Sequence, residues 1–257
     1  MRKPFIGGNW KMNTDGKGAV ELAKGVAQKC STMLNKVDVC ICPPFVYLAV
    51  VKNALNSSDI SLGAQDVYFE PKGAFTGEVS CQMLKDIGCK NVIIGHSERR
   101  HVIRETDELI NKKLIAAIDA GLLPIFCVGE LLEQRKTGKT EQVVKEQIQK
   151  GLNGLTAEKV KTVTIAYEPV WAIGTGINAT PQQAQEVHLM IRQLISKMYN
   201  KDLAGQIRIQ YGGSAKADNA AELMSQADVD GLLVGGASLK ADEFAAMVKA
   251  AAEAKKN

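Results

Sequence analysis

Short apolar runs recur eight times along the chain, and this repetition is the feature that most limits the folds available to it. The runs are mostly apolar and do not alternate strictly with polar residues, as expected for strands that are buried on both faces of a parallel sheet. Helix-like segments separate them, so the pattern predicts alternating strands and helices. The runs occupy residues 4–10, 37–42, 60–65, 91–96, 122–130, 162–168, 207–213 and 230–236.

The clearest helix is expected at residues 180–198. Thr180 can cap its first turn, Pro181 stands at the first helical position, and Gln183 completes a capping box. Apolar residues then fall on one face at helical spacing, which indicates that the helix packs on a core.

Eight strands separated by helices favour an α/β fold of the (β/α)8 barrel type over an open, doubly wound sheet, which is the alternative. A chain of 257 residues commonly forms one such barrel, so we expect a single domain over residues 1–257. In a barrel, functional side chains gather where the strands end at the C-terminal rim. The polar or glycine residues that follow the predicted strands are Asn9, Lys11, Gln65, His96, Glu130, Glu168, Gly212, Gly213, Ser214, Gly235 and Gly236.

Composition and charge exclude several classes of protein. No apolar run approaches the roughly 18 residues that span a bilayer, so we expect no membrane segment, and polar residues interrupt the N-terminal stretch before an export signal can form. The net charge of +4 includes no polybasic block, which argues against a nucleic-acid partner and is compatible with a small anionic ligand. The six cysteines are scattered without CxxC spacing, which indicates reduced thiols in a cytoplasmic protein.

Three short motifs resemble cofactor or metal sites, but each lacks a required element. The glycines of "GTGINA" at residues 174–179 do not directly follow a strand, as a dinucleotide site requires. "TGKT" at residues 137–140 has Glu133 where a phosphate-binding loop needs its first glycine. His96 and His101 miss the i, i+4 spacing of a zinc-binding helix. We therefore expect neither a cofactor nor a metal.

A phosphate site is better supported, because paired glycines follow the last two predicted strands. "YGGS" ends at Ser214, and "VGGAS" contains Gly235 and Gly236. A helix-like segment follows each motif, so backbone N–H groups and a helix N-terminus can approach an anion there. In a barrel this is a frequent place for a phosphate.

The side chains at the other strand ends specify a type of reaction. Lys11 can point into the barrel mouth as a fixed cation. His96 precedes Ser97, a candidate helix cap, and the helix N-terminus would keep the imidazole neutral. Together with the carboxylate of Glu168, these groups suit proton abstraction next to a carbonyl, with His96 and Lys11 stabilising an enediolate.

Motifs in this order along nearly the whole chain resemble those of the triosephosphate isomerase family. The resemblance implies a (β/α)8 or TIM barrel, and it is most specific in "GHSERR" and "AYEPVWAIGTG", the third and fifth of these motifs. The motifs are "GGNWKMN", "AQDVYFEPKGAFTGEVS", "GHSERR", "CVGE", "AYEPVWAIGTG", "YGGSA" and "DGLLVGGASL".

The resemblance implies a role for each strand-end residue. Glu168 would be the base that moves a proton between C1 and C2, and His96 would be the neutral electrophile that polarises the carbonyl. Lys11 would hold the charge of the phosphate and the enediolate, with Asn9 positioning Lys11 and the substrate. The reaction would interconvert dihydroxyacetone phosphate and D-glyceraldehyde 3-phosphate in glycolysis and gluconeogenesis, without a cofactor or metal.

The resemblance also implies a lid beside Glu168. Gly174 would offer its N–H to the phosphate together with Ser214, Gly235 and Gly236. The lid would comprise Pro169, Val170, Trp171, Ala172, Ile173, Gly174, Thr175, Gly176, Ile177, Asn178 and Ala179.

Lid closure would exclude water and shield the intermediate. Ile173 and Leu233 would then form an apolar clamp over Glu168 that raises its basicity by desolvation.

A homodimer is a further implication. Residues 65–80 would form a projecting loop that enters the partner, with Phe75 in the interface and Thr76 reaching Asn9 and Glu98 of the neighbouring subunit. Without the resemblance, this loop is a polar, glycine-containing segment in which the phenylalanines Phe69 and Phe75 need burial.

Three stretches depart from the family's usual pattern. Arg104 stands where the family usually has glycine, and the second lid hinge, Ile177–Ala179, lacks the commoner lysine. "GELLEQR" at residues 129–135 lacks the usual threonine or lysine after the glutamate.

Two other functions stay open. The alternatives are a non-catalytic barrel that binds a sugar phosphate or serves as a scaffold, and a Schiff-base aldolase in which Lys11 is the nucleophile.

Overall fold

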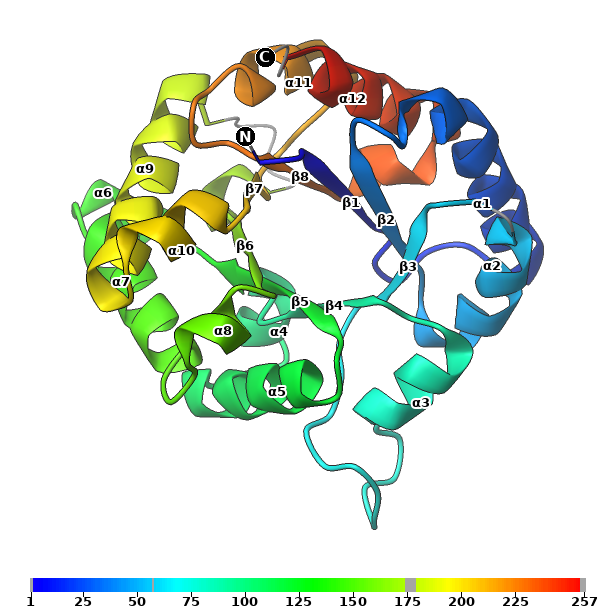
Figure 1. Cartoon of the computed structure of the whole chain (residues 1–257), viewed down its shortest axis with the longest axis horizontal. Helices are drawn as coiled ribbons and strands as arrows, with labels where there is room; N and C mark the ends of the chain where they lie inside the picture. Colours follow the sequence, from blue (N-terminus) through cyan, green and yellow to red (C-terminus); the bar gives the residue numbers. More distant parts are fainter. Residues whose placement is uncertain (1, 57, 174–178, 255–257) are drawn as a thin grey trace.

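The computed structural model describes residues 2–56, 58–173 and 179–254, and it has the alternating architecture that the apolar runs predict. Within these residues, parallel strands form a closed barrel in sequence order, β1 to β8 (Figure 1). The strands are β1 (Phe5–Asn9), β2 (Asp38–Cys42), β3 (Ser61–Ala64), β4 (Asn91–Ile94), β5 (Leu123–Val128), β6 (Thr164–Tyr167), β7 (Ile209–Tyr211) and β8 (Gly231–Val234).

Pairing of the first and last strands closes the sheet. Phe5 of β1 lies beside Asp38 of β2 on one side and beside Gly231 of β8 on the other. This pairing confirms the (β/α)8 barrel and rules out the open sheet. The observed strands are shorter than the apolar runs, since the polar and glycine residues at the ends of the runs belong to the rim.

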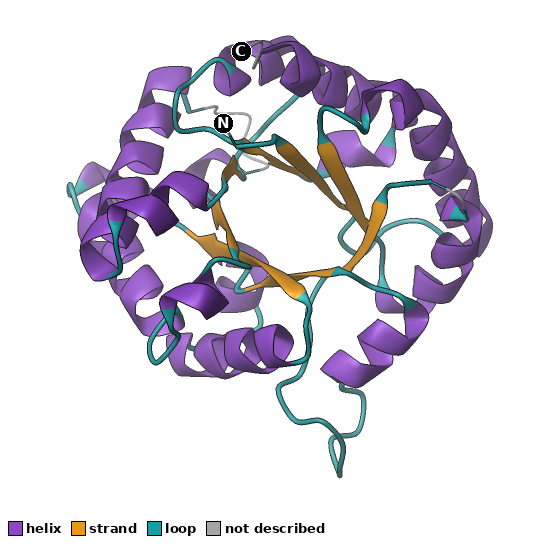
Figure 2. Ribbon diagram, viewed as in Figure 1, coloured by secondary structure: helices purple, strands orange, loops and turns teal. Residues whose placement is uncertain are grey.

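The helices form an outer ring around the barrel (Figure 2). Their amphipathic faces pack on the strands, and single turns of 3-10 helix lie at Ser31–Met33, Phe45–Tyr47, Val170–Ala172 and Gly236–Leu239. The helices are α1 (Gly16–Cys30), α2 (Leu48–Leu55), α3 (Cys81–Ile87), α4 (Ser97–His101), α5 (Asp107–Asp119), α6 (Leu132–Lys136), α7 (Thr140–Gly151), α8 (Ala157–Val160), α9 (Pro181–Met198), α10 (Lys201–Gln206), α11 (Ala217–Met224) and α12 (Ala241–Ala254).

Helix α9 begins as the sequence predicts. The Oγ1 of Thr180 accepts a hydrogen bond from the N–H of Gln183 at 3.1 Å, and the Oε1 of Gln183 accepts one from the N–H of Thr180 at 2.9 Å. The reciprocal bonds confirm the capping box, with Pro181 in the first turn.

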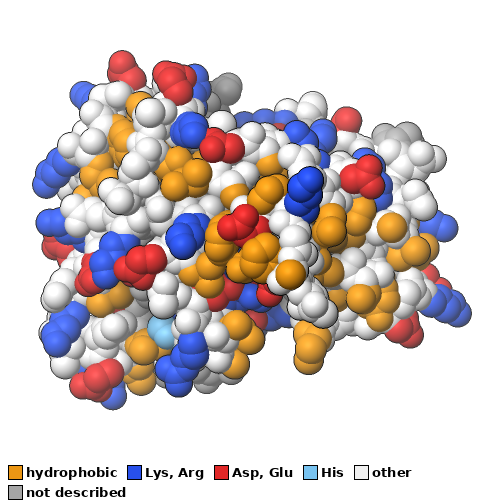
Figure 3. Space-filling view, turned by 90° about the horizontal axis from the view of Figure 1, so that it is seen from below, with side chains coloured by type: hydrophobic (Ala, Val, Ile, Leu, Met, Phe, Trp, Pro, Cys, Tyr) orange, Lys and Arg blue, Asp and Glu red, His pale blue; other side chains and the backbone are white. Residues whose placement is uncertain are grey.

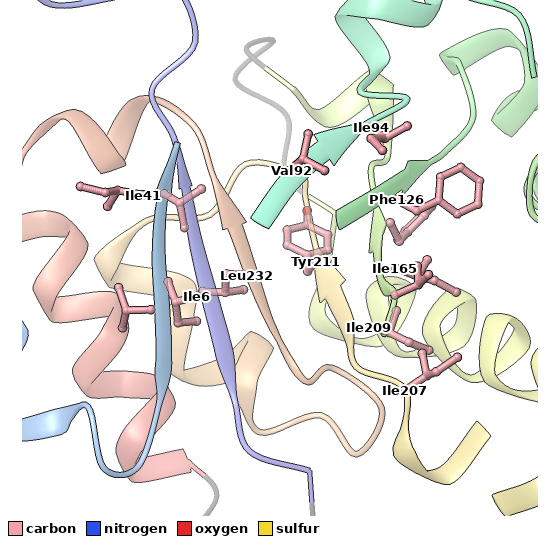
Figure 4. Packing of buried hydrophobic residues seen from close by; sticks show 14 of the residues in the cluster. Ile6, Ile41, Val92, Ile94, Phe126, Ile165, Ile207, Ile209, Tyr211 and Leu232 are labelled. Carbon is pink, nitrogen blue, oxygen red and sulfur yellow. The ribbon is translucent and has the colours of Figure 1, made fainter. Parts of the chain in front are cut away.

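Two apolar layers hold the barrel together. The larger one fills the space between strands and helices and includes Ile6, Phe126 and Ile165 (Figure 4). The smaller one fills the barrel interior, and its members are Phe5, Cys40, Cys42, Ile93, Ile125, Cys127, Ala166 and Leu233. Burial of this kind contributes about 25 cal/mol for each Å² of apolar surface removed from water, so both layers stabilise the closed form.

All six cysteines are buried free thiols. Burial raises the pKa of Cys30 and of Cys89 to about 12, and it raises the pKa of Cys40 and of Cys127 well above the usual value. None of the helices in the described parts of the chain is long and apolar enough to cross a membrane.

His188 of α9 is a fully buried titratable group whose ring meets that of Tyr167 in β6 edge-on, with the ring centres 5.9 Å apart. Its Nδ1 lies 3.2 Å from the carbonyl oxygen of Asp228, and its Nε2 has no hydrogen-bond partner among the described residues. Burial lowers the pKa of His188 to about 4. The neighbouring Arg192 bonds to Asp228 at 2.5 Å and to Asp230 at 2.6 Å, so these acidic groups are already paired.

We predict that His188 makes the fold sensitive to acid. The unfolded chain binds a proton on this residue below its usual pKa of 6.5, whereas the folded chain does so only below about 4. The free energy of unfolding therefore falls as the pH decreases from 6.5 to 4, by about 3 kcal/mol from this residue. His188→Gln should remove that part of the slope in urea unfolding followed between these pH values. An identical slope in wild type and variant would show that His188 is not responsible.

Candidate active site

A cavity of about 380 Å³ opens at the C-terminal ends of the strands. Most of the residues singled out from the sequence line it, while Gly174 and the rest of 174–178 lie outside the described residues. The predicted residues that the cavity brings together are Asn9, Lys11, His96, Glu168, Ile173, Gly212, Gly213, Ser214, Leu233, Gly235 and Gly236.

Glu168 lies directly after β6 on the cavity floor, and its side chain is only 2% exposed. Its N–H donates to the carbonyl oxygen of Val128 in β5 at 2.7 Å. Gly129 makes this approach possible, because a Cβ there would stand 1.7 Å from the carbonyl oxygen of Glu168. Backbone contacts between the ends of two adjacent strands thus fix the position of the Glu168 Cα atom.

The Glu168 carboxylate is held by the start of α4. The N–H of Ser97 donates to Oε2 at 2.9 Å, and the Ser97 hydroxyl donates to Oε1 at 3.2 Å. The Nε2 of His96 lies 3.0 Å from Oε1. Both oxygens of the Glu168 carboxylate therefore have polar partners at the start of α4.

These contacts shift the two pKa values in opposite directions. Burial alone would raise the pKa of Glu168, but the charge of His96 and hydrogen bonds from His96 and Ser97 outweigh it, so that pKa lies below its usual 4.5. Burial alone would lower the pKa of His96, but the charge and hydrogen bond of Glu168 hold it above its usual 6.5. This is opposite to the direction that the helix N-terminus favours.

The hydrogen bond at the other ring nitrogen favours the neutral imidazole. The N–H of Glu98 donates to Nδ1 of His96 at 3.3 Å, which leaves the ring proton on Nε2, facing Glu168. The protonation of His96 therefore depends on where the Glu168 carboxylate lies.

Lys11 is held in an unusual backbone conformation, with φ of 51°. The Asn9 side chain accepts from its N–H at 3.0 Å, and the Gln65 side chain donates to its carbonyl oxygen at 2.8 Å. A non-glycine residue in this region of φ is strained, and such strain is often found at functional sites. The Lys11 ammonium bonds to Glu98 at 2.6 Å, so its charge is partly neutralised.

The segment predicted to form the first lid hinge, residues 169–171, contacts Glu130, which follows β5. Glu130 is fully buried and accepts hydrogen bonds from the Trp171 indole at 2.9 Å and from the Tyr167 hydroxyl at 3.1 Å. The guanidinium of Arg135 lies 5.5 Å from the centre of the Trp171 ring. The N–H of Ser214 donates to the carbonyl oxygen of Ala172 at 3.1 Å, which joins the hinge to the glycine motif after β7. Ala179, at the other end of the predicted lid, is buried.

Four cavity residues were missed by sequence reasoning. Two of them are alanines inside the glycine motifs, one directly follows "YGGSA", and the last lies in the first turn of α12, so extending the search through the start of each following helix would have found the two charged residues. They are Ala215, Lys216, Ala237 and Glu243.

The loop that precedes α3 projects from the barrel (Figure 1). Its aromatic rings pack on one another, with the ring centre of Tyr68 4.5 Å from that of Phe69 and 4.9 Å from that of Phe75. Thr76 is exposed beside them. Seen from the side on which this loop projects, the surface has hydrophobic side chains among charged ones near its centre (Figure 3).

A buried ionic cluster joins the base of this loop to α4. The Lys113 ammonium bonds to Asp66 at 2.8 Å and to Glu105 at 2.5 Å, and Arg99 of α4 bonds to both carboxylates. Burial raises the pKa of Asp66 to about 6 against the lowering effect of Lys113. Arg104, next to Glu105, has φ of 70°, the left-handed conformation that glycine adopts more easily.

Comparison with known proteins agrees with this geometry. The sequence model of the family described as triosephosphate isomerase matches residues 4–251. This chain belongs to the triosephosphate isomerase family. It is therefore an isomerase, and its barrel is the TIM barrel.

Its sequence is similar to proteins named triosephosphate isomerase from several bacteria. It is 57% identical to that of Carboxydothermus hydrogenoformans, covering 97% of this chain and 99% of the relative. It is 51% identical to those of Chloroherpeton thalassium and Rhodopirellula baltica, covering 98% of this chain and at least 99% of each relative.

We predict that Ser97→Ala raises the pKa of Glu168. The hydroxyl donates to the carboxylate, and a hydrogen bond to the charged form lowers a pKa, so its removal must raise it. A carbon-13 NMR titration of the labelled glutamate carboxyls would measure the change. Ser225→Ala, on a distant helix end, is the matched control and should leave the Glu168 titration unchanged. An unchanged or lower Glu168 pKa in Ser97→Ala would contradict the prediction.

Proposed function

We propose that this chain interconverts dihydroxyacetone phosphate and D-glyceraldehyde 3-phosphate through an enediolate, with Glu168 as the base. The observation that carries the proposal is the buried Glu168 carboxylate, 3.0 Å from Nε2 of His96, in one cavity with Lys11 and the glycine motifs. A base, a hydrogen-bond donor, a cation and a phosphate cradle are the groups that this reaction needs.

Glu168 would become a stronger base as it reaches the substrate. The contacts with Ser97 and His96 lower its pKa, while burial raises it. When the carboxylate moves from Ser97 to a carbon-bound proton, the lowering contacts are lost and the desolvation remains. Ile173 and Leu233, which both line the cavity, would maintain that desolvation.

His96 would act as a neutral hydrogen-bond donor in the same step. Once Glu168 has moved, the charge that raises the His96 pKa is farther away, and burial lowers this pKa again. The N–H of Glu98 keeps the proton on Nε2, where it can polarise the substrate carbonyl.

Lys11 would exchange its partner when substrate binds. The phosphate and the enediolate attract the Lys11 ammonium more strongly than one partly exposed carboxylate does, so they can displace it from Glu98. Asn9 and Gln65 hold the Lys11 backbone while the side chain turns.

The phosphate would lie against the two glycine motifs. Ser214, Gly235 and Gly236 line that end of the cavity. Gly174 would add its N–H when the lid, residues 169–179, closes and excludes water. No cofactor or metal takes part in the proposed reaction, since the side chains supply the base, the acid and the charge.

We expect purified protein to convert D-glyceraldehyde 3-phosphate in an assay coupled to glycerol-phosphate dehydrogenase. Glu168→Gln should lower the rate by at least about 100-fold, because a positioned general base contributes on this scale. The carboxylate and the amide have nearly the same shape, so the loss reports chemistry. A near-native rate in the variant would place the base elsewhere.

The same preparation separates the two alternatives. An aldolase that uses Lys11 would form a covalent adduct when borohydride is added with substrate, and we expect none. A non-catalytic barrel would bind a phosphorylated enediolate mimic no better than the substrate, whereas an isomerase binds the mimic more tightly. Absence of turnover in folded wild-type protein would contradict the proposed function.

The proposal includes a homodimer of one catalytic domain, residues 1–257, in the cytoplasm. Large apolar side chains are exposed on the loops around the site, with Met12 95% and Val46 80% exposed, and Phe75 remains partly exposed within its aromatic cluster. Burial of these groups would favour association. Thr76 of the projecting loop would then reach Asn9 and Glu98 of the second copy. The proposal involves no nucleic acid and no membrane.

Thr76→Arg should convert the dimer to a monomer, since a long cation would replace a small side chain at the tip of the interface loop. Sedimentation equilibrium would give the mass. Thr137→Arg, the same change at an exposed turn after α6, is the matched control and should leave the dimer intact. A monomeric wild type, or a dimeric Thr76→Arg variant, would be evidence against this interface.

A further inference from the structure

The cations of the cavity are not equally available to an anion. Two lysines, Lys11 and Lys216, line it among the described residues. The Lys11 ammonium lies 2.6 Å from a Glu98 carboxylate oxygen. The Lys216 side chain is exposed and forms no ion pair or hydrogen bond in the described parts of the chain. Its backbone is engaged, since the N–H donates to Asn219 and the carbonyl oxygen accepts from the N–H of Ala220 at 3.0 Å. Of the two lysines that line the cavity in the described part of the chain, Lys216 is therefore the one whose ammonium has no ionic partner.

Lys216 stands at the end of the cavity where the glycine motifs lie. It follows Ser214 by two residues and immediately precedes α11. On the other side of this end, Glu243 in the first turn of α12 also lines the cavity. Glu243 bonds to Lys240 at 2.8 Å, so the two walls present an unpaired cation and a paired carboxylate.

Lys216 and Glu243 have opposite effects on an approaching anion, because their charges are opposite. An approaching phosphate dianion is attracted by Lys216 and is repelled by Glu243 more weakly, because Lys240 offsets part of that carboxylate's charge, and neither effect requires contact. The charge of Lys11 is offset by Glu98 until substrate displaces that carboxylate. The first attraction must then come from a cation that has no partner.

We propose that Lys216 is the residue that captures the phosphate group of the substrate before Lys11 engages it, and that Glu243 weakens this capture. The inference rests on the proposed isomerase function for its substrate. Its ligand chemistry, a small phosphate dianion, does not depend on the reaction. Lys216 acts in binding and takes no part in proton transfer.

The kinetic signature is a change in kcat/KM that depends on salt. At an ionic strength of about 0.01 M the screening length is about 30 Å, and at about 0.15 M it is about 8 Å. Lys216→Gln should lower kcat/KM for D-glyceraldehyde 3-phosphate by about 3- to 10-fold at the lower salt, and the loss should shrink at the higher salt. Its kcat should stay within about two-fold of wild type, because the catalytic groups are unchanged.

Two further variants separate charge from structure. Lys216→Arg keeps the charge and should restore kcat/KM. Glu243→Gln should raise kcat/KM at low salt, the opposite of Lys216→Gln. Lys201→Gln, at the start of α10 and outside the cavity, changes the net charge by the same amount and should behave as wild type.

Titration with inorganic phosphate tests the same idea without turnover. Binding should weaken in Lys216→Gln and tighten in Glu243→Gln at low salt. If wild-type protein bound phosphate in this way but showed no isomerase activity, the proposed function would fail and the role of Lys216 would stand. Equal losses in Lys216→Gln and Lys201→Gln, a loss independent of salt, or a loss confined to kcat would overturn the inference.

Discussion

The hydrogen-bonded pairing of β1 with β8 is the constraint on which the site depends. It turns a row of strands into a ring, so residues that lie far apart in sequence share one rim. Lys11 after β1 and Glu168 after β6 line the same cavity only because the ring is closed. An open sheet with the same strands would place these groups on a line. Closure of the barrel thus brings residues from distant parts of the sequence together around one cavity.

The pattern of apolar runs was sufficient to predict the barrel, because strands buried on both faces leave a clear signal in the sequence. The rim residues were predictable for the same reason, since Asn9 ends β1, His96 lies two residues after β4 and Glu168 directly follows β6. Details set by contacts across the ring were not predictable. The raised pKa of His96 comes from Glu168, which is distant in sequence. Likewise, local sequence reports nothing about which lysine of the cavity has an ionic partner.

Charge balance within small groups is a recurrent property of this structure. Lys11 is paired with Glu98, and His96 is paired with Glu168, at the cavity formed by the strand ends. Behind α4, two cations and two carboxylates form a buried cluster that fixes both this helix and the base of the projecting loop. Pairing reduces the cost of placing charges away from water. The groups at the mouth can exchange partners with a ligand, whereas the buried cluster holds the surrounding backbone in place.

The state of the cysteines has a practical consequence for chemical labelling. A thiol reacts with an electrophile as its thiolate, and burial keeps the thiolate scarce in this protein by raising the pKa of Cys30 and of Cys89 to about 12. All six native thiols are also shielded from solvent. One cysteine introduced on an exposed turn would therefore react with a maleimide dye far faster than the native residues. The wild-type sequence is thus a ready background for attaching a single fluorophore.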